Sequence, residues 1–334
     1  MTVDVLSDVL RAVRLTGAVY FDFELSSPWV AEAPPSREIA GKVMPGAQRV
    51  IEYHLIARGH CWGHAIGQAP IRLCEGDLIV FPQGDAHVLS SAPGMRAAPD
   101  MSAFARPSAR LPIVYELGGG GPERARVVCG FLGCDERPYN PLLTALPAMI
   151  HLSASGPQAP HGAPETTGWL GTLLSIAVKE SGSARAGGEN VLARLSELLF
   201  VEAIRRYLEI LPPTQTGWLA GLRDPVIGQA LAALHGAPSE PWTVERLGRL
   251  VGLSRSVIAE RFTEMVGQPP MQYLALWRMQ LASRLLVEGE GVGEVADAVG
   301  YESEAAFSRA FKKLVGQAPA TWRRATGPPR IDRP

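Results

Sequence analysis

The cysteines and histidines between residues 54 and 134 are the side chains best suited to chemistry in this sequence of 334 residues. Cys129 and Cys134 have a spacing that suits a zinc site or a redox pair, and further nitrogen and sulfur ligands lie upstream. The candidate metal ligands are Cys61, His64, His87, Cys129 and Cys134. Free cysteine is also a common small residue of apolar cores. Metal binding, thiol redox sensing and plain packing are therefore three alternatives, and packing, with no cofactor, is the one we expect.

The position of His87 is defined by a longer pattern. Residues 76–87 have the form Gly-x5-Pro-x-Gly-x2-His. In this pattern a strand ends at Pro82, Gly84 permits a turn, and His87 then points into a barrel. The segment resembles the second motif of the cupin barrels, although Ser91 stands where that motif has asparagine.

The remaining histidines do not complete a catalytic metal site. His54, His60 and His64 contain no His-x-His pair of the kind found in the first cupin motif. A metalloenzyme needs three or four converging ligands, and the sequence offers one well-placed histidine. We therefore expect no enzyme activity. The residues expected to line an effector pocket are His54, Trp62 and His87.

The elements that must position these residues change in character along the chain. Between residues 47 and 89, short apolar runs broken by Gly and Pro are typical of a small antiparallel β-structure. Residues 168–179 and 189–211 have apolar residues at helical spacing, and the polar, proline-containing segment 211–217 indicates a linker. The leucine-rich segment 189–211 is a candidate homodimerisation helix, and packing on its own barrel is the alternative.

An internal repeat is the strongest pattern in the sequence. Residues 242–267 and 292–316 resemble each other at a spacing of about 48 residues. The matching positions are Gly252 with Gly300, Phe262 with Phe311, and Val266-Gly267-Gln268 with Val315-Gly316-Gln317. A single copy could be a plain pair of packed helices, but two matching copies favour a DNA-binding protein.

Each copy has the parts of a helix-turn-helix. A short helix is followed by a glycine that permits a sharp left-handed turn. Ser254 or Ser303 then provides the N-cap of a second helix, which ends at Gly267 or Gly316. The large residues expected in the helical core are Phe262, Trp277, Phe311 and Trp322.

A long helix is predicted between the two copies. Residues 271–288 contain no Gly or Pro and would span roughly 27 Å as a helix. A rod of this length could hold two recognition helices about one DNA turn apart, roughly 34 Å. Both helices would then enter successive major grooves on one face of a duplex.

These features together resemble a known family. Residues 224–324 are similar to the DNA-binding domain of the AraC/XylS family, and residues 300–313, with Gly316 and Pro319, match its signature. The resemblance implies an α+β multidomain protein with an N-terminal cupin-like β-barrel, flanking helices and a C-terminal all-α tandem helix-turn-helix domain. The expected divisions are 1–150 for the barrel, 151–211 for a helical linker or dimerisation segment, 212–223 for the interdomain linker, and 224–325 for the DNA-binding domain.

The resemblance also assigns roles to individual residues. The positions expected to read base edges are Arg255, Ser256, Ala259, Glu260, Glu304, Ala305, Ala306 and Arg309. The positions expected to contact phosphate are Arg261, Lys312, Lys313, Arg323 and Arg324. Arg309 is the strongest candidate for base reading, with a surface or phosphate role as its alternative. Glu260 stands where related proteins often carry a basic or amide residue. Whether the first helix-turn-helix reads DNA bases therefore stays open.

The charge distribution agrees with a local DNA-binding surface. The whole chain has a formal net charge of −1, but residues 305–325 carry five Lys and Arg and no Asp or Glu. The first residues lack the basic start and apolar run of a signal peptide, and no run of about 18 apolar residues predicts a membrane span. We therefore expect a cytoplasmic protein.

The sequence favours a transcription regulator that is controlled by a signal sensed in the barrel. Its expected partners are promoter DNA, a second copy of the chain and an unknown small-molecule or redox signal, and RNA polymerase is a further candidate. Two other classes remain open: a cupin enzyme with a DNA-binding tail, and a DNA-binding architectural protein without a signal.

Overall fold

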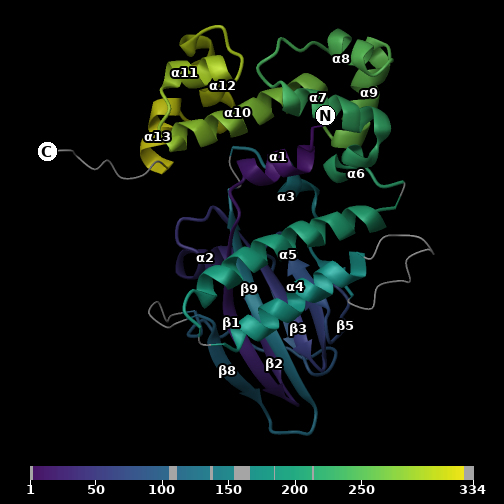
Figure 1. Ribbon diagram of the computed structural model, residues 1–334, viewed down its shortest axis with the longest axis vertical. Coiled ribbons are helices and arrows are strands. Elements are labelled where there is room, and N and C mark those ends of the chain that lie inside the picture. Colours follow the sequence, from purple (N-terminus) through teal and green to yellow (C-terminus); the bar gives the residue numbers. More distant parts are fainter. Residues whose placement is uncertain are drawn as a thin grey trace, which may run out of the picture. The chain divides into compact units, whose positions relative to one another are not determined.

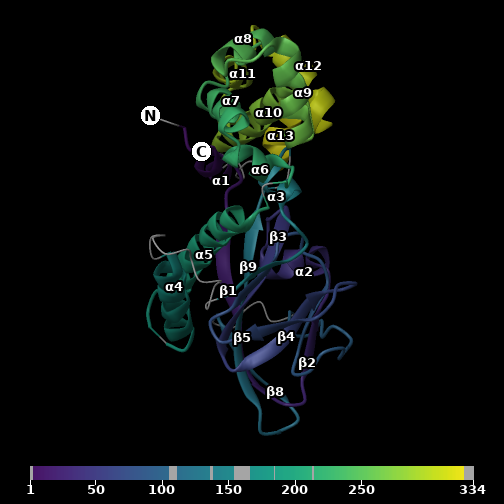
Figure 2. The ribbon, with the colours of Figure 1, turned by 90° about the vertical axis from the view of Figure 1, so that its right-hand side faces the viewer.

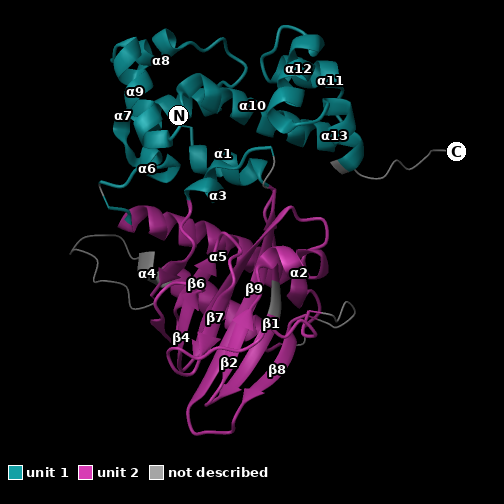
Figure 3. Cartoon of the chain, turned by 180° about the vertical axis from the view of Figure 1, so that it is seen from behind, with its two compact units in different colours: residues 1–13, 136–145, 211–334 teal, residues 14–135, 146–210 magenta. Residues whose placement is uncertain are grey.

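The computed structural model describes residues 3–104, 111–135, 138–153, 166–183, 185–212 and 214–326. The chain divides into two compact units (Figure 3). One unit contains residues 14–135 and 146–210, and the other contains residues 1–13, 136–145 and 211–334. Part of the expected helical segment, residues 154–165, lies outside the described residues.

The unit of residues 14–135 and 146–210, magenta in Figure 3, is a barrel of two sheets, which we call the barrel unit. Its strands are β1 (Thr16–Ser26), β2 (Val30–Ala33), β3 (Arg49–Arg58), β4 (His60–Ala65), β5 (Ile71–Cys74), β6 (Leu78–Phe81), β7 (His87–Ser90), β8 (Ile113–Gly118), β9 (Arg124–Cys134) and β10 (Ile150–Leu152). Six strands form one sheet in the order β10-β6-β3-β9-β1-β8, and four form the other in the order β2-β7-β4-β5. Among the described strands, every pairing is antiparallel except that of β1 with β8, which is parallel.

The alternation of side chains along the strands forms the barrel core. Phe21 and Leu25 of β1, Val127 and Phe131 of β9, and Phe81 of β6 belong to one cluster of buried apolar residues between the sheets. At about 25 cal/mol per Å² of apolar surface, burying one such side chain contributes about 1.5–3 kcal/mol.

Helices cover the outside of the larger sheet. The barrel unit contains α2 (Ser36–Val43), α4 (Thr166–Ser181) and α5 (Gly188–Ile210), and Figures 1 and 2 show α4 and α5 side by side along the sheet that contains β1. Gly17 permits α5 to approach β1 closely, because a Cβ atom there would collide with the carbonyl of Ala193. Tyr53 of β3 also points towards α5, where its hydroxyl lies 2.5 Å from Ser196 Oγ.

The other unit, teal in Figure 3, is all helical in its described residues, and we call it the helical unit. Its helices are α1 (Val5–Ala12), α3 (Pro141–Ala145), α6 (Trp218–Arg223), α7 (Pro225–Gly236), α8 (Val244–Leu250), α9 (Arg255–Val266), α10 (Pro270–Glu288), α11 (Val292–Ala298), α12 (Glu304–Val315) and α13 (Pro319–Thr326). The predicted rod is α10, whose 19 residues span about 28 Å. Among the described helices, none is both long and apolar enough to cross a membrane.

Two segments from early in the sequence pack within the helical unit, a grouping that differs from the expected domain boundaries. The buried amide of Gln280 on α10 joins both of them. Its Nε2 donates to the carbonyl of Ala12 at 3.0 Å, and its Oε1 accepts from the backbone N–H of Tyr139 at 3.1 Å. The Tyr139 hydroxyl accepts a further bond from Gln268 Nε2 at 2.6 Å. The helical unit is therefore assembled from three separate stretches of chain.

Candidate DNA interface and barrel cavity

The first helix-turn-helix consists of α8 and α9. The Thr243 side chain caps α8 by accepting from the backbone N–H of Arg246, and the Ser254 side chain caps α9 by accepting from that of Val257. Gly252 joins the two helices with a φ of 71°, a conformation that glycine adopts without strain. Each cap satisfies a helix-terminal N–H that would otherwise lack a partner, worth about 1 kcal/mol. The predicted capping by Ser254 is confirmed.

The second helix-turn-helix, α11 and α12, repeats this construction. Ser303 caps α12 by accepting from the backbone N–H of Ala306 at 3.2 Å. Gly300 has a φ of 78° in the turn, and a Cβ atom there would also collide with the backbone of Ser239. The left-handed glycines Gly267 and Gly316 end α9 and α12 as predicted.

The large apolar residues of both units are buried rather than exposed for stacking. Phe262 is on the buried face of α9, and Phe307 and Phe311 are on the buried face of α12; all three are 0% exposed. Trp277 of α10 and Trp322 of α13 are also buried, at 1% and 5%. The predicted core assignments are confirmed, and only one face of each second helix is left for a ligand.

The positions expected to read bases lie on that outer face. Exposed positions are Arg255, Ser256, Glu260, Glu304, Ala305 and Arg309, and half-buried positions are Ala259 and Ala306. The sequence repeat therefore places polar or small residues at equivalent accessible sites on α9 and α12. Their contact with DNA bases stays a prediction.

The cations near these helices differ in their partners. Arg255 Nε lies 2.7 Å from Glu245 Oε1, and Arg261 Nη2 lies 2.7 Å from Asp224 Oδ2. Asp224 also caps α7, so its pair with Arg261 links α9 to α7. Arg309 forms no ion pair with any residue that the structure describes. The exposed cations that follow it are Lys312, Lys313 and Arg324, whereas Arg323 is half-buried and donates to the carbonyl of Glu290.

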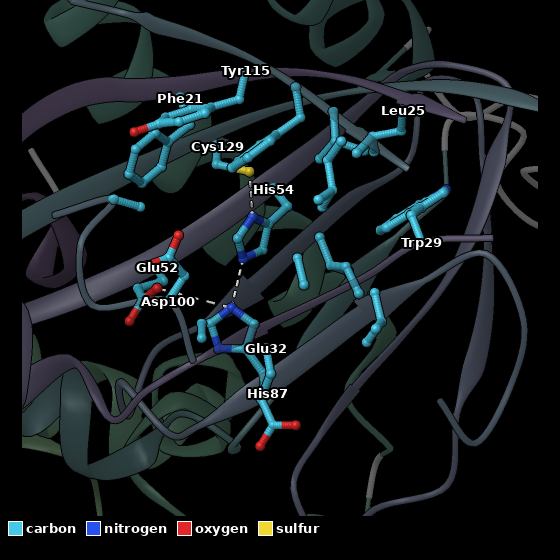
Figure 4. Close-up of a pocket in the computed structure, with 18 of the residues that line it drawn as sticks. Phe21, Leu25, Trp29, Glu32, Glu52, His54, His87, Asp100, Tyr115 and Cys129 are labelled. Atoms are coloured by element: carbon cyan, nitrogen blue, oxygen red, sulfur yellow. Dashed lines mark hydrogen bonds and ion pairs between the residues drawn. The ribbon is translucent and has the colours of Figure 1, made fainter. Parts of the chain in front are cut away.

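The barrel contains a cavity of about 200 Å³. Most of its wall is apolar, formed by aromatic and aliphatic side chains from both sheets and from residues 98–104 (Figure 4). The principal wall residues are Phe21, Phe23, Leu25, Trp29, Leu89, Phe104, Tyr115 and Phe131. A cavity with this wall suits a small apolar molecule.

Three polar side chains converge at one end of the cavity, which we call the polar pole: Glu52, His54 and His87. Glu52 and His54 occupy alternate positions on β3 and so share a face, whereas Tyr53 between them points towards α5. His87 begins β7 in the other sheet, and its ring stacks on Phe81 with centroids 3.8 Å apart. All three side chains are buried, at 2%, 7% and 1% exposure.

A directed chain of hydrogen bonds runs through the two histidines. His87 Nδ1 lies 2.9 Å from the Asp85 carbonyl, which can only accept, so this nitrogen carries the proton. Neutral His87 therefore accepts at Nε2 from His54 Nε2, 2.7 Å away. His54 then accepts at Nδ1 from the thiol of Cys129 at 2.8 Å. Figure 4 shows His54 between Cys129 and His87 in this order.

Burial shifts the pKa values at the polar pole in the directions that favour the uncharged forms of these side chains. Desolvation lowers the pKa of His87 to about 4 and that of His54 well below its usual value, with a further effect of His87 on His54. Burial also raises the pKa of Glu52 to about 8 and that of Cys129 well above its usual range. A protonated Cys129 is a poor nucleophile, which argues against the redox alternative at this thiol.

The structure brings together some of the predicted sensor residues and separates others. His54 and His87 line the cavity as expected, but Trp62 is not among the described residues that line it. Cys61 and Ala65 of β4 belong to the barrel core, so Trp62 between them points to the opposite face.

Of the predicted metal ligands, His87 alone belongs to the group of described residues whose donor atoms converge. Cys61 and Cys129 are core residues, and burial raises the pKa of Cys61 to about 12. The sequence interpretation missed Glu52. The Glu-x-His spacing of Glu52 and His54 on one strand was the signal that could have identified it.

A barrel with an apolar cavity and a tandem helix-turn-helix define a DNA-binding protein with a sensor-type domain. Two family models match this chain: one described as Cupin covers residues 4–209, and one described as Helix-turn-helix domain covers residues 247–325. The chain belongs to the AraC family of helix-turn-helix transcription regulators that carry an N-terminal cupin domain. The predicted fold class and the predicted regulator function are thereby confirmed.

Individual relatives agree with this family. An AraC-like transcription regulator of Streptomyces lividans is 34% identical over 281 residues, covering 83% of this chain and 88% of that protein. The transcriptional regulator AlkR of Acinetobacter baylyi is 30% identical over 284 residues, covering 81% and 90%. Among solved structures, the DNA-binding domain of AdpA in complex with a target DNA is 32% identical, covers 30% of this chain and 92% of that chain, and has a TM-score of 0.29. The relatives from Streptomyces lividans and Acinetobacter baylyi are both described as transcription regulators and not as enzymes.

Proposed function

We propose that this regulator binds promoter DNA by placing α9 and α12 in successive major grooves on one face of the duplex. The observation that carries the proposal is the equivalence of the two helices. Each is 12 residues long, begins at a serine cap and ends at a left-handed glycine. Because α10 spans about 28 Å between them, the spacing suits one turn of DNA, roughly 34 Å.

The exposed residues of the two helices support different roles. Arg255, Ser256, Ala259 and Glu260 on α9, and Glu304, Ala305, Ala306 and Arg309 on α12, are the proposed base-reading set. Lys312, Lys313 and Arg324 are exposed cations suited to phosphate contacts. Arg261 and Arg323 already bind Asp224 and the Glu290 carbonyl, so their contribution to phosphate binding is the weaker expectation.

The cavity of the barrel unit is the proposed site of the signal. A side-chain-filled barrel would have favoured an architectural protein, but the cavity of about 200 Å³ favours a sensor. A signal would regulate transcription only if it bound two arrangements of the protein with different affinity. A second copy of the chain and RNA polymerase remain proposed partners.

Selection of binding sites from random DNA, followed by hydroxyl-radical footprinting, tests the proposal. We expect two protected segments per protein, centred about one helical turn apart on the same face of the duplex. Protection of a single major groove, or of opposite faces, would contradict the arrangement. A preparation that binds every sequence with equal affinity would contradict sequence-specific reading itself.

A further inference from the structure

The polar pole has a buried carboxyl oxygen that lacks a hydrogen-bond partner among the residues the structure describes. Glu52 Oε1 has no hydrogen-bond partner among the described residues, although Glu52 is only 2% exposed. Leaving a buried polar atom unpaired costs about 1–3 kcal/mol, and more for a charged group. A position of this kind is suited to a ligand that supplies the missing partner.

The donor atoms around this oxygen have the arrangement of a metal site. One ligand atom from each of Glu52, His54 and His87 lies within 4.8 Å of the other two. The two histidine Nε2 atoms are 2.7 Å apart, and His87 Nε2 is 3.9 Å from Glu52 Oε2. With metal–ligand bonds of about 2.1 Å, two nitrogens at 2.7 Å subtend about 80° at a shared ion, close to the 90° of six-coordinate geometry.

We propose that Glu52, His54 and His87 bind one divalent transition-metal ion, in a 2-His-1-carboxylate arrangement whose open positions face the cavity. The three residues are fixed by their elements, because two share a face of β3 and the third begins β7 of the facing sheet. Two nitrogen ligands and one oxygen ligand favour iron, nickel, cobalt or zinc over magnesium and calcium. The proposal rests on the proposed function, since it specifies the chemistry of the sensor cavity.

The residues behind the two histidines fit this role. A histidine that binds a metal usually donates its second ring N–H to a carbonyl or another acceptor. His87 Nδ1 makes this bond to the Asp85 carbonyl at 2.9 Å. His54 Nδ1 faces Cys129 Sγ at 2.8 Å, so a change of tautomer turns His54 Nε2 towards the ion with a free lone pair while Nδ1–H donates to sulfur. Cys129 is then a positioning residue and not a ligand.

The apolar wall limits what could occupy the open coordination positions. A molecule that coordinates the ion would place the rest of its body against Phe21, Phe104 and Phe131. We therefore assign to the cavity a small, largely apolar signal molecule with one donor atom for the metal.

Cobalt(II) is the probe for a direct test on the full chain, after treatment with a chelator. Titration with Co²⁺ is expected to show one ion bound per chain and visible d–d absorption. Glu52→Gln and His87→Ala are each expected to weaken Co²⁺ binding by more than 100-fold. Cys129→Ser is expected to keep the stoichiometry and weaken binding by roughly 10-fold, as for other residues that orient a ligand. The matched control is His64→Ala, which removes another buried histidine of the barrel and is expected to bind as the wild type does.

Two results would overturn the metal site. The first is a wild-type chain that takes up no stoichiometric Co²⁺, Fe²⁺, Ni²⁺ or Zn²⁺. The second is unchanged Co²⁺ affinity in both Glu52→Gln and His87→Ala. Binding of the selected DNA, measured both without metal and with added Co²⁺, separates the two proposals. Specific DNA binding by a chain that takes up no metal overturns the metal site alone, whereas a folded chain that binds no DNA specifically in either condition contradicts the proposed function.

Discussion

Two arginines, one on each of the proposed recognition helices α9 and α12, differ in the ion pair that they would lose on binding DNA. The Arg255 guanidinium is held by Glu245 at 2.7 Å, but both side chains are more than half exposed, so the pair is worth less than about 1 kcal/mol. Arg309 has no competing carboxylate among the described residues. Arg309 can therefore turn towards a base without breaking an ion pair, whereas Arg255 must first leave Glu245.

Replacement of Arg309 by alanine is expected to weaken binding to the selected DNA by about 1–3 kcal/mol and to relax the preference at one base pair. The physical reason is the loss of a bidentate contact to guanine. Fluorescence anisotropy with the selected duplex and its single-base variants, at one fixed salt concentration, measures both effects. Lys312→Ala is the control, because losing a phosphate contact should weaken binding to all sequences about equally. Unchanged affinity and preference in Arg309→Ala would remove Arg309 from the reading set.

Residues with local roles were predictable from the sequence, and residues with distant partners were not. Ser254 and Ser303 cap the helices that begin beside them, so a few neighbouring residues identify the role. Glu52 acquires its role from His87, which belongs to a strand of the other sheet. No short segment of sequence specifies which strands face each other across a barrel.

At the scale of elements, α7 and α10 of the helical unit pack through a buried histidine. The ring of His235 stacks on Trp277 with centroids 4.2 Å apart, and its Nε2 lies 2.7 Å from the Tyr273 hydroxyl. No described residue binds its other ring nitrogen. Desolvation lowers the pKa of His235 to about 3, so the packed helices favour the neutral ring.

Mild acid is expected to destabilise this packing. The folded pKa lies below the unfolded value of about 6.5, so the stabilisation is fully present above pH 6.5 and is lost as the pH falls from there towards 3. Between pH 7 and pH 5 the loss from His235 is about 2 kcal/mol. Hydrogen exchange of the α10 amides measures this change within the helical unit. His235→Phe keeps an aromatic ring but cannot titrate, and an equal pH dependence in this variant would contradict the assignment.

At the scale of the whole molecule, the order of the elements was more predictable than their grouping. The β-rich region, the helical pair and the tandem helix-turn-helix follow each other as the sequence indicated. The sequence could not show that α1 and α3 pack with the helices that follow residue 211, because these contacts join residues more than 100 positions apart.

The predicted homodimerisation concerns the exposed apolar residues of α5 and of its neighbour α4. α5 buries Leu195 and Leu199 within its own barrel unit, as the alternative interpretation required, yet it leaves Val191 and Leu198 44% and 47% exposed. On the neighbouring helix α4, Trp169 and Ile176 are 53% and 43% exposed. Each pair is seven residues apart and so lies on one face of its helix.

Leu198→Glu is expected to shift a dimeric chain towards monomer, because a carboxylate in an apolar interface must be desolvated without a partner. Sedimentation velocity at several protein concentrations measures the change. Ile66→Glu introduces the same charge at another exposed apolar position of the barrel unit and serves as the control. A wild-type chain that stays monomeric at all concentrations, or equal dissociation in both variants, would contradict dimerisation through α5.

The hydrogen bonds of Gln280 determine which segments a chimaera of two such regulators must keep together. A hybrid joined at the 211–217 linker would separate Gln280 from the Ala12 carbonyl and the Tyr139 N–H that belong to it, and would supply the foreign protein's residues in their place. A transplant that carries residues 1–13 and 136–145 together with the C-terminal helices keeps these bonds. The boundary between the two units therefore lies at several positions in the sequence and not at one. A single recombination event near residue 211 cannot exchange the barrel unit without also replacing the two early segments that pack with the C-terminal helices.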